Sequence, residues 1–469
     1  MPRANIAAVH AWRAEFAAEK RHHDASAERL TQGWSFLVLM LMLLYVLIGH
    51  APYQHDVALD ADTGAAEISP VNRYIWILLA AMSMPLLWAR RDQLVAVLKR
   101  LWLLVAVFVW FFLTTLWALD PAAAHRRFFL YIIAVIISLA LVLGFNDSKK
   151  LHYAFVVTCG VMVMIDLLSW LILPRVSMTD VGLAAIHSHK NTLGAVMLFC
   201  GIVIGPYLMV EKPRGQQVFW SFMMVAVMAL LVASQSKTSL SILLVTIFLC
   251  PFILFVLKLR GQTIHAIIAT IIMMLFFGVL GYLAWCTATG LDPLAPFQGI
   301  TFTQRTDVWV FVFAEIFKHP LIGSGFGSFW DIDPLLQPSL NAGLWFGSPD
   351  LANQAHNGYL DLLVTTGVIG LVGALALLFG WFARGFSELR RILQSNNPAD
   401  RWNIGAATTL GLFPLLIFVH NWMESSYFTA NTIFGTLILV IGMDLDLNRF
   451  RTPSVGGGNS SPSSFQGRR

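Results

Sequence analysis

One histidine in this chain stands where a titratable side chain can act on a substrate. His356 follows a long connecting segment and directly precedes an apolar run. Asn357 is the next residue, and Gly367 comes ten residues after it. Imidazole changes its charge near neutral pH, so a histidine at the mouth of a membrane helix is a candidate proton acceptor or donor. Asparagine is a preferred N-cap residue, so Asn357 is a candidate cap of the helix that follows. The alternative is that His356 is a polar helix-end residue without chemistry.

The composition indicates the medium in which this histidine lies. Of 469 residues, 57% are hydrophobic and 12% are charged, about half the charged share of a typical soluble domain. We therefore expect an all-α polytopic membrane protein. The net charge of +5 does not by itself indicate nucleic-acid binding, because the positive-inside bias of membrane proteins also produces it. The four cysteines form no CxxC pair and are interpreted as small apolar residues.

About twelve apolar stretches are candidate membrane-spanning helices, and most approach the ~20 residues needed to cross a bilayer. They cover residues 34–50, 74–89, 101–119, 128–145, 152–173, 192–210, 217–233, 239–257, 264–285, 358–383, 404–421 and 427–446. The connection between the ninth and tenth stretches, residues 286–356, is too long for an ordinary loop, and loops of that length usually have a function. We expect a membrane domain over 33–446, a polar segment over 1–32 without signal-peptide character, and a disordered tail over 447–469.

Lys and Arg residues orient these helices, because membrane proteins keep an excess of them on the cytoplasmic side. With the N-terminus placed inside, all but eight of the 31 Lys and Arg residues lie in inner segments. Both termini are therefore expected in the cytoplasm. The long loop 286–356, and His356 with it, is expected to face outward.

Four of the eight outer cations immediately precede helices expected to start on the outer side: Arg126, Arg127, Lys190 and Lys237. A helix N-terminus already carries about half a positive charge. Added cations at three such ends therefore predict a site for an anion of high charge, such as a diphosphate. Asn191 is a candidate cap of the helix after Lys190. The competing interpretation is that these cations extend to the membrane surface and contact lipid headgroups.

The outer loop has a pattern of its own. Residues 304–317 predict a helix that ends before Pro320, and residues 323–327 predict a flexible glycine-rich turn. No strand precedes this turn, so it is not interpreted as a nucleotide-binding fingerprint. Asp331 and Asp333 have the DxD spacing of metal-dependent sugar transferases. No second cluster of ligands accompanies them in the loop, so we expect no metal site.

In their order and sidedness, these segments resemble the O-antigen ligase and Wzy-type polysaccharide polymerase superfamily. The motifs are His356-Asn357 with Gly367, Arg305-Thr306 with Trp309, the sequence HPLIGSG at 319–325, His189-Lys190-Asn191 with Gly194, and Glu424-Ser425. The resemblance covers most of residues 100–446 and is most like the exopolysaccharide-polymerase branch. The chain departs from many relatives at Lys237, where they have Arg. Lysine neutralises a phosphate but lacks the bidentate fork of arginine.

The resemblance implies a GT-C-like membrane glycosyltransferase in the bacterial inner membrane, with a periplasmic active site and no cofactor. Its donor would be an oligosaccharide on undecaprenyl diphosphate, and its acceptor a sugar hydroxyl. In this interpretation His356 is the base, and Glu424 orients it or binds the acceptor. Arg305 binds the diphosphate, with help from Arg126, Arg127, Lys190 and Lys237. The bilayer, a flippase and chain-length or export proteins are the expected partners, and nucleic acid is not.

Three functions remain open at this point. A polymerase extends another lipid-linked chain, whereas a ligase attaches the glycan to the lipid A core, and the motif at His189 favours the polymerase. A secondary transporter is the third alternative. Transporters place ionisable residues near the membrane midplane, but here Asp166 is the main acid inside a span and the cations gather at the outer side. That distribution favours an enzyme.

Overall fold

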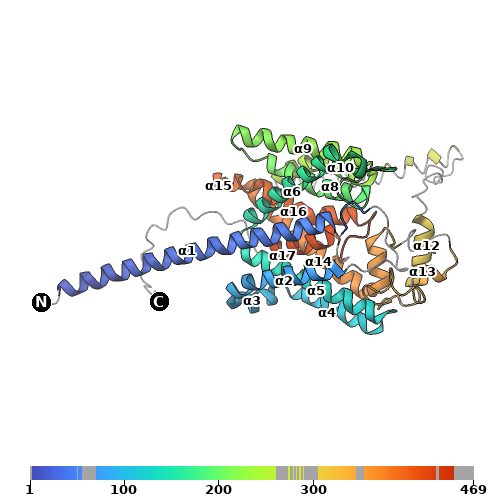
Figure 1. The fold of residues 1–469 in the computed structure, drawn as a ribbon, viewed down its shortest axis with the longest axis horizontal. Helices are drawn as coiled ribbons and strands as arrows, with labels where there is room; N and C mark the ends of the chain where they lie inside the picture. Colours follow the sequence, from blue (N-terminus) through green and yellow to red (C-terminus); the bar gives the residue numbers. More distant parts are fainter. Residues whose placement is uncertain are drawn as a thin grey trace.

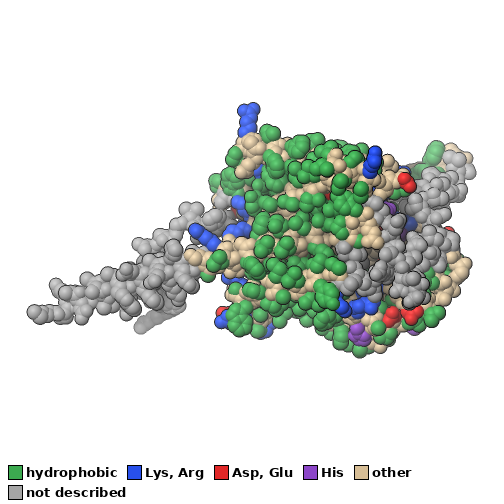
Figure 2. All heavy atoms as spheres, viewed as in Figure 1, with side chains coloured by type: hydrophobic (Ala, Val, Ile, Leu, Met, Phe, Trp, Pro, Cys, Tyr) green, Lys and Arg blue, Asp and Glu red, His purple; other side chains and the backbone are tan. Residues whose placement is uncertain are grey.

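The computed structural model describes residues 3–49, 51–54, 70–259, 305–344, 353–428 and 432–447, with a few positions between 273 and 289. The chain forms a helical bundle in which α1 projects beyond one end and α12 and α13 lie at the opposite end (Figure 1). On the face drawn in Figure 2, hydrophobic side chains cover the middle of the bundle, and most charged side chains lie towards its two ends. This distribution fits a bundle that crosses a membrane along its long axis.

The elements follow one another with short connections over most of the described chain. In order they are α1 Arg3–Ile48, α2 Pro70–Ala89, η1 Arg91–Gln93, α3 Leu94–Arg100, α4 Trp102–Thr114, η2 Thr115–Trp117, α5 Pro121–Phe145, α6 Ser148–Ile172, α7 Pro174–Ser177, β1 Met178–Thr179, β2 Gly182–Leu183, α8 Lys190–Leu208, α9 Arg214–Ser234, α10 Lys237–Lys258, α12 Arg305–Ile316, α13 Pro338–Asn341, α14 Gly358–Gln394, α15 Pro398–Arg401, α16 Ile404–His420 and α17 Ile433–Leu447. The two short strands pair antiparallel, with Met178 opposite Leu183.

Within the described ranges, eight helices are long and apolar enough to cross a membrane. The pair Arg91–Arg100 and Trp102–Trp117, bent by 78°, makes a ninth if it counts as one span. The helices α16 and α17 are shorter, with 17 and 15 residues. The expected span 264–285 lies almost entirely outside the described residues. The all-α polytopic membrane fold is thus confirmed, while the number twelve stays a prediction.

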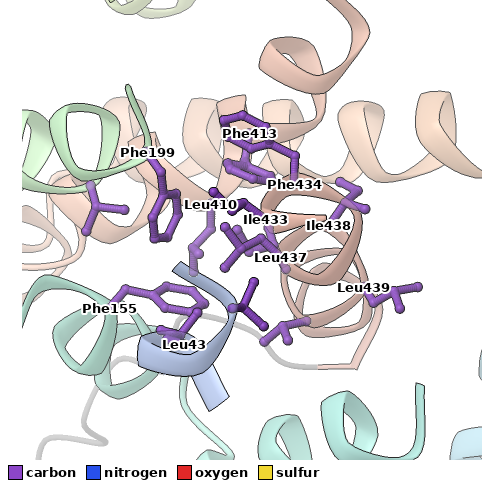
Figure 3. Close-up of a cluster of buried hydrophobic side chains, with 14 of the residues drawn as sticks. Leu43, Phe155, Phe199, Leu410, Phe413, Ile433, Phe434, Leu437, Ile438 and Leu439 are labelled. Atoms are coloured by element: carbon purple, nitrogen blue, oxygen red, sulfur yellow. The ribbon is translucent and has the colours of Figure 1, made fainter. Parts of the chain in front are cut away.

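One continuous core joins helices that are distant in the sequence. Figure 3 shows Leu43 of α1, Phe155 of α6, Phe199 of α8 and Phe413 of α16 converging on the side chains of α17. The rings of Phe155 and Phe199 meet edge to face with centroids 6.0 Å apart, and those of Phe199 and Phe413 do so at 6.2 Å. Close packing is what holds membrane helices together, because lipid tails are as apolar as the side chains. This core therefore holds together the helices whose ends carry the segments described below.

The start expected for one helix is wrong. The helix expected at 128–145 begins seven residues earlier, at Pro121, because Asp120 caps it by accepting a hydrogen bond from the backbone N–H of Ala123 at 3.0 Å. Proline fits the first helical position, where its missing N–H costs nothing. The helix α1 runs without interruption from Arg3 through the first apolar span to Ile48, and the domain boundary at residue 32 stays a prediction.

The helix expected at 358–383 extends to Gln394 and is broken at Gly367, which has φ 68° and ψ −176°. Residues 320–325 lie against this break. The N–H of Val368 donates to the carbonyl of Pro320 at 2.9 Å, and that of Gly325 donates to the carbonyl of Thr365 at 2.8 Å. A Cβ at Gly367 would overlap the carbonyl of Leu321. Glycine is required here both by the positive φ and by this close approach.

Candidate active site

Glu424 holds two of the predicted catalytic residues at once. Its Oε2 lies 3.1 Å from Nδ1 of His356, and its Oε1 accepts a hydrogen bond from Nη2 of Arg305 at 3.2 Å. Nη1 of Arg305 also donates to the carbonyl of Met423 at 2.5 Å. The three side chains come from the start of α12, the residue before the cap of α14 and the segment after α16. The fold therefore joins Glu424 to residues that are 68 and 119 positions away in sequence.

One face of α12 forms hydrogen bonds with this cluster and with the segment next to it. Residues four apart on a helix lie on the same side, and Arg305 and Trp309 have that spacing. Nε1 of Trp309 donates to the carbonyl of Ala355 at 2.9 Å, one residue before His356. A single helical face thus fixes both the histidine segment and the glutamate segment.

The backbone around His356 is sharply turned. His356 has φ 50°, in the left-handed region that non-glycine residues seldom adopt. Asn357 occupies the N-cap position of α14, and its Oδ1 accepts hydrogen bonds from the N–H groups of Tyr359 at 3.1 Å and Leu360 at 3.2 Å. From this turn, the imidazole contacts Glu424 through its Nδ1.

Asp361 is a buried link between the two segments that carry the cluster. The N–H of Ala355 donates to both of its oxygens, at 3.1 and 3.2 Å, and the hydroxyl of Ser425 donates to Oδ2. Nε1 of Trp330 donates to Oδ1 at 2.7 Å. Ala355 precedes His356 and Ser425 follows Glu424, so one carboxylate ties down both neighbours of the His356–Glu424 pair.

Asn421 joins the end of α16 to the start of α14. Its carbonyl accepts from the N–H of Gly358 at 2.9 Å, and its Oδ1 accepts from the N–H groups of Ser426 at 3.1 Å and Tyr427 at 2.9 Å. A Cβ at Gly358 would overlap the side chain of Asn421. This junction sets the position from which Glu424 reaches His356.

The electrostatics of the cluster favour an ionised glutamate. Burial by itself would raise the pKa of Glu424, but the hydrogen bond and charge of His356, together with the charges of Arg305 and His420, lower it below its usual range. An ionised carboxylate only accepts hydrogen bonds, so whenever the imidazole is neutral it carries its proton on Nδ1. The lone pair of Nε2 is then available to accept a proton. The His356 side chain is 31% exposed, which leaves it accessible to a substrate.

Arg127 is committed to holding the outer loop. Its Nη1 donates to the carbonyls of Gly327 at 2.9 Å and Trp330 at 2.7 Å, and its Nη2 donates to the carbonyl of Asp331. The sequence predicted that Arg126 and Arg127 immediately precede a helix. Because α5 begins at Pro121, neither Arg127 nor the exposed Arg126 lies at a helix N-terminus. The argument from the helix end therefore fails for this pair, although Arg127 still borders a pocket.

The other predicted cations lie at helix starts. Lys190 is the first residue of α8, and its ammonium donates to the carbonyl of Val181 at 3.0 Å. Lys237 is exposed and is the first residue of α10. The predicted cap Asn191 is wrong, since His189 occupies the N-cap position and its Nδ1 accepts from the N–H of Asn191 at 3.2 Å. No contact within the described residues joins either lysine to the His356 cluster.

A pocket of about 420 Å³ opens beside the cluster. Its lining includes Arg127, Trp330, Asp361 and Ser425, as well as Gln354, which lies two residues before His356. Asp331 also lines it; burial raises the pKa of this carboxyl, and the charge of Arg127 offsets part of the effect. The pocket thus combines hydrogen-bonding groups with aromatic surface, a combination that suits a sugar.

The DxD aspartates serve the loop itself. Oδ1 of Asp333 accepts a hydrogen bond from the N–H of Leu335 at 2.9 Å, which closes a turn. Asp331 has φ 53° and gives its carbonyl to Arg127. Over the part of the chain that the structure describes, no three His, Cys, Asp or Glu side chains gather as a metal site would require.

Asp361 and its donors Trp330 and Ser425 were not predicted as site residues. One signal was available, because an acid in the first turn of an apolar helix is costly in a membrane unless it is paired. The same reasoning does not identify Asn421, whose role depends on contacts between α14 and α16.

The comparison with protein families agrees with this geometry. Residues 181–375 match a family model described as O-Antigen ligase. The matched segment contains Arg305 and His356, whereas Glu424 lies beyond it. A search of curated proteins gave no match. This match covers less than half of the chain, and on an all-α fold with several helices able to span a membrane it supports the similarity to the O-antigen ligase and Wzy-type polymerase superfamily.

Proposed function

We propose that the protein transfers an oligosaccharide from undecaprenyl diphosphate to the hydroxyl of an acceptor sugar, at the periplasmic face of the bacterial inner membrane. The observation that supports this is the pair of contacts made by Glu424, which orients His356 with one oxygen and holds Arg305 with the other. A carboxylate, an imidazole with a free Nε2 and a guanidinium are together suited to deprotonate a hydroxyl beside an anion.

The proposed reaction is a substitution at the anomeric carbon of the donor. Nε2 of His356 takes the proton of the acceptor hydroxyl, and the acceptor oxygen forms a bond to the anomeric carbon. The bond from that carbon to the diphosphate breaks, and its electron pair leaves with the diphosphate oxygen. Glu424 stabilises the imidazolium that forms, as the carboxylate of a catalytic triad does. The diphosphate is an acidic leaving group, so it needs charge stabilisation more than a general acid.

Arg305 is proposed to stabilise that leaving group. Its guanidinium has five N–H donors, and its contacts to Met423 and Glu424 use only part of that set. Lys190, Lys237 and Arg126 are proposed to contribute positive charge as the lipid-linked donor approaches. Arg127 is assigned to the shape of the loop and the pocket, because three carbonyls already occupy it.

The test is a transfer assay with purified protein, a lipid-linked donor and a sugar acceptor. His356→Ala should lower the transfer rate by about 10²–10⁴-fold, the usual contribution of a general base. His319→Gln is the matched control, because His319 is an exposed histidine of the same loop. Unchanged transfer by His356→Ala would refute the proposed mechanism. Uptake of the donor into proteoliposomes without any transfer would instead support a transporter.

For the acceptor, we propose another lipid-linked chain, which makes the reaction exopolysaccharide polymerisation. The similarity of His189-Lys190-Asn191 to that branch supports the proposal. Offering the enzyme both a lipid-linked glycan and a lipid A core distinguishes the two acceptors. Longer lipid-linked chains would support polymerisation, and glycan attached to the core would show a ligase. In either case a flippase is proposed to supply the donor, and chain-length or export proteins to receive the product.

A further inference from the structure

A second and larger pocket lies at the end of the bundle opposite the His356 cluster. Its volume is about 960 Å³, more than twice the 420 Å³ of the pocket beside His356. Its walls come from α1, the start of α6, the connection between α8 and α9, and the start of α16. The short helix α15, which directly precedes α16, lies at the end of the bundle far from α12 and α13 (Figure 1). The proposed glycan transfer does not use this pocket.

Three lysines line this pocket: Lys149, Lys150 and Lys212. The ammonium of Lys150 donates to Oε1 of Gln32 at 2.7 Å, and that of Lys212 donates to backbone carbonyls, including that of Val210 at 2.7 Å. Within the described ranges, no carboxylate forms an ion pair with any of the three. Their positive charge is therefore not neutralised by direct pairing.

Two acids also border the pocket, and they leave it with an excess of positive charge. Oδ1 of Asp147 accepts a hydrogen bond from the N–H of Lys149 at 2.9 Å and so caps α6. Glu211 is exposed at the rim. Three cations against two anions favour an anionic ligand with a small net charge.

The walls between these charges are aromatic. The ammonium of Lys212 lies 3.9 Å from the centre of the Tyr207 ring, and that of Lys149 lies 5.9 Å from the centre of the Trp402 ring. Tyr153 and Trp402 also line the pocket, and half of each is exposed. Half-exposed aromatic rings beside lysines are typical of the boundary between membrane and water. A soluble anion would require only the cations, whereas these walls offer apolar surface as well.

The position of Gly33 shows that the pocket has room along α1. Gly33 lines the pocket, and a Cβ placed there would meet no atom within 4 Å. From the cations, the aromatic walls and this open space, we propose that the pocket binds the headgroup of an anionic phospholipid such as phosphatidylglycerol. Basic pockets between membrane helices bind lipid headgroups in this way. The lysines contact the phosphate, and the aromatic rings contact the glycerol and the first part of the acyl chains.

The test measures lipid binding to the full-length protein in detergent by native mass spectrometry. Phosphatidylglycerol should bind more tightly than phosphatidylcholine. The double variant Lys149→Gln/Lys150→Gln should weaken phosphatidylglycerol binding about 25-fold, since each lysine near an anionic lipid contributes about fivefold. Lys99→Gln is the matched control, because Lys99 is an exposed lysine of α3 that does not line the pocket. Lys212 is left intact because its ammonium donates to the carbonyl of Tyr207 at the end of α8 and to that of Val210 just after it.

A second variant separates pocket binding from general attraction to charge. Gly33→Phe fills the open space without removing a cation, and it should abolish phosphatidylglycerol binding while thermal unfolding in phosphatidylcholine stays unchanged. Equal binding of the two lipids, or unaltered binding by both variants, would overturn the proposal. Competition by soluble glycerophosphoglycerol at equal concentration would also overturn it, because it would assign the pocket to a free phosphate ester.

Discussion

Replacing Glu424 with Gln removes one negative charge while keeping the size of the side chain. The amide oxygen can still accept the hydrogen bond from Nδ1 of His356, which spans 3.1 Å in the wild type. What is lost is the charge that stabilises the imidazolium during transfer. A hydrogen bond to a charged group contributes about 1.5–3 kcal/mol. The two side chains are 31% and 24% exposed, so we take about 2 kcal/mol, which predicts a rate about 30-fold lower.

A double-mutant cycle tests whether this loss passes through His356. The four proteins are the wild type, Glu424→Gln, His356→Ala and the double variant, all measured in the transfer assay with a labelled donor and long incubation. If Glu424 acts by stabilising the imidazolium of His356, then Glu424→Gln should hardly lower the transfer rate further in the His356→Ala background. A full 30-fold loss in the His356→Ala background would refute this reasoning and would assign Glu424 to the acceptor instead.

Four further outcomes follow from the same contacts. Asp361→Asn should lower the transfer rate about tenfold, since a hydrogen bond to a charged group is lost there. The same variant should expose the segment before His356 to protease. Unchanged digestion of that segment would contradict the role of Asp361 as a link. Gly367→Ala should destabilise the fold by more than about 1 kcal/mol because of its positive φ and the overlap with Leu321, whereas Gly205→Ala, which faces open space, should not lower the unfolding temperature. The depressed pKa of Glu424 means that its contribution to stability is present above the usual glutamate value of about 4.3 and is lost as the pH falls below it. As the pH falls through that range, the unfolding temperature of Glu424→Gln should therefore fall less than that of the wild type. Parallel plots of unfolding temperature against pH for the two proteins would argue against this contribution of Glu424. Finally, transfer should survive a chelator, and activity restored only by added Mg²⁺ would contradict a metal-independent reaction.

The sequence was most informative where a local pattern decides the structure. Apolar run lengths predicted most of the helices, and residues 304–317 predicted α12, which runs over Arg305–Ile316. The choice of His356, Arg305 and Glu424 came from a family resemblance, and their mutual contacts depend on the fold. Composition and spacing alone do not show that one glutamate contacts both of the other residues.

Several features that the sequence did not reveal depend on contacts between distant segments. Arg127 donates hydrogen bonds to carbonyls some two hundred residues further along the chain. No local sequence pattern predicts such partners. The break at Gly367 exists because the backbone of Leu321 approaches it, which is again a long-range event. The start of α5 was different, because Asp120 followed by Pro121 is a local helix-start signal that the apolar run concealed.

The order of the three cluster residues along the chain has a consequence for biogenesis. Arg305 and His356 are synthesised well before Glu424, which follows α16. A nascent chain that has exposed the outer loop but has not yet inserted α16 therefore contains the arginine and the histidine without the carboxylate that joins them. The segment 181–375 alone is in the same state. The cluster is completed only when nearly the whole chain has entered the membrane, so insertion of the last helices is the step that assembles it.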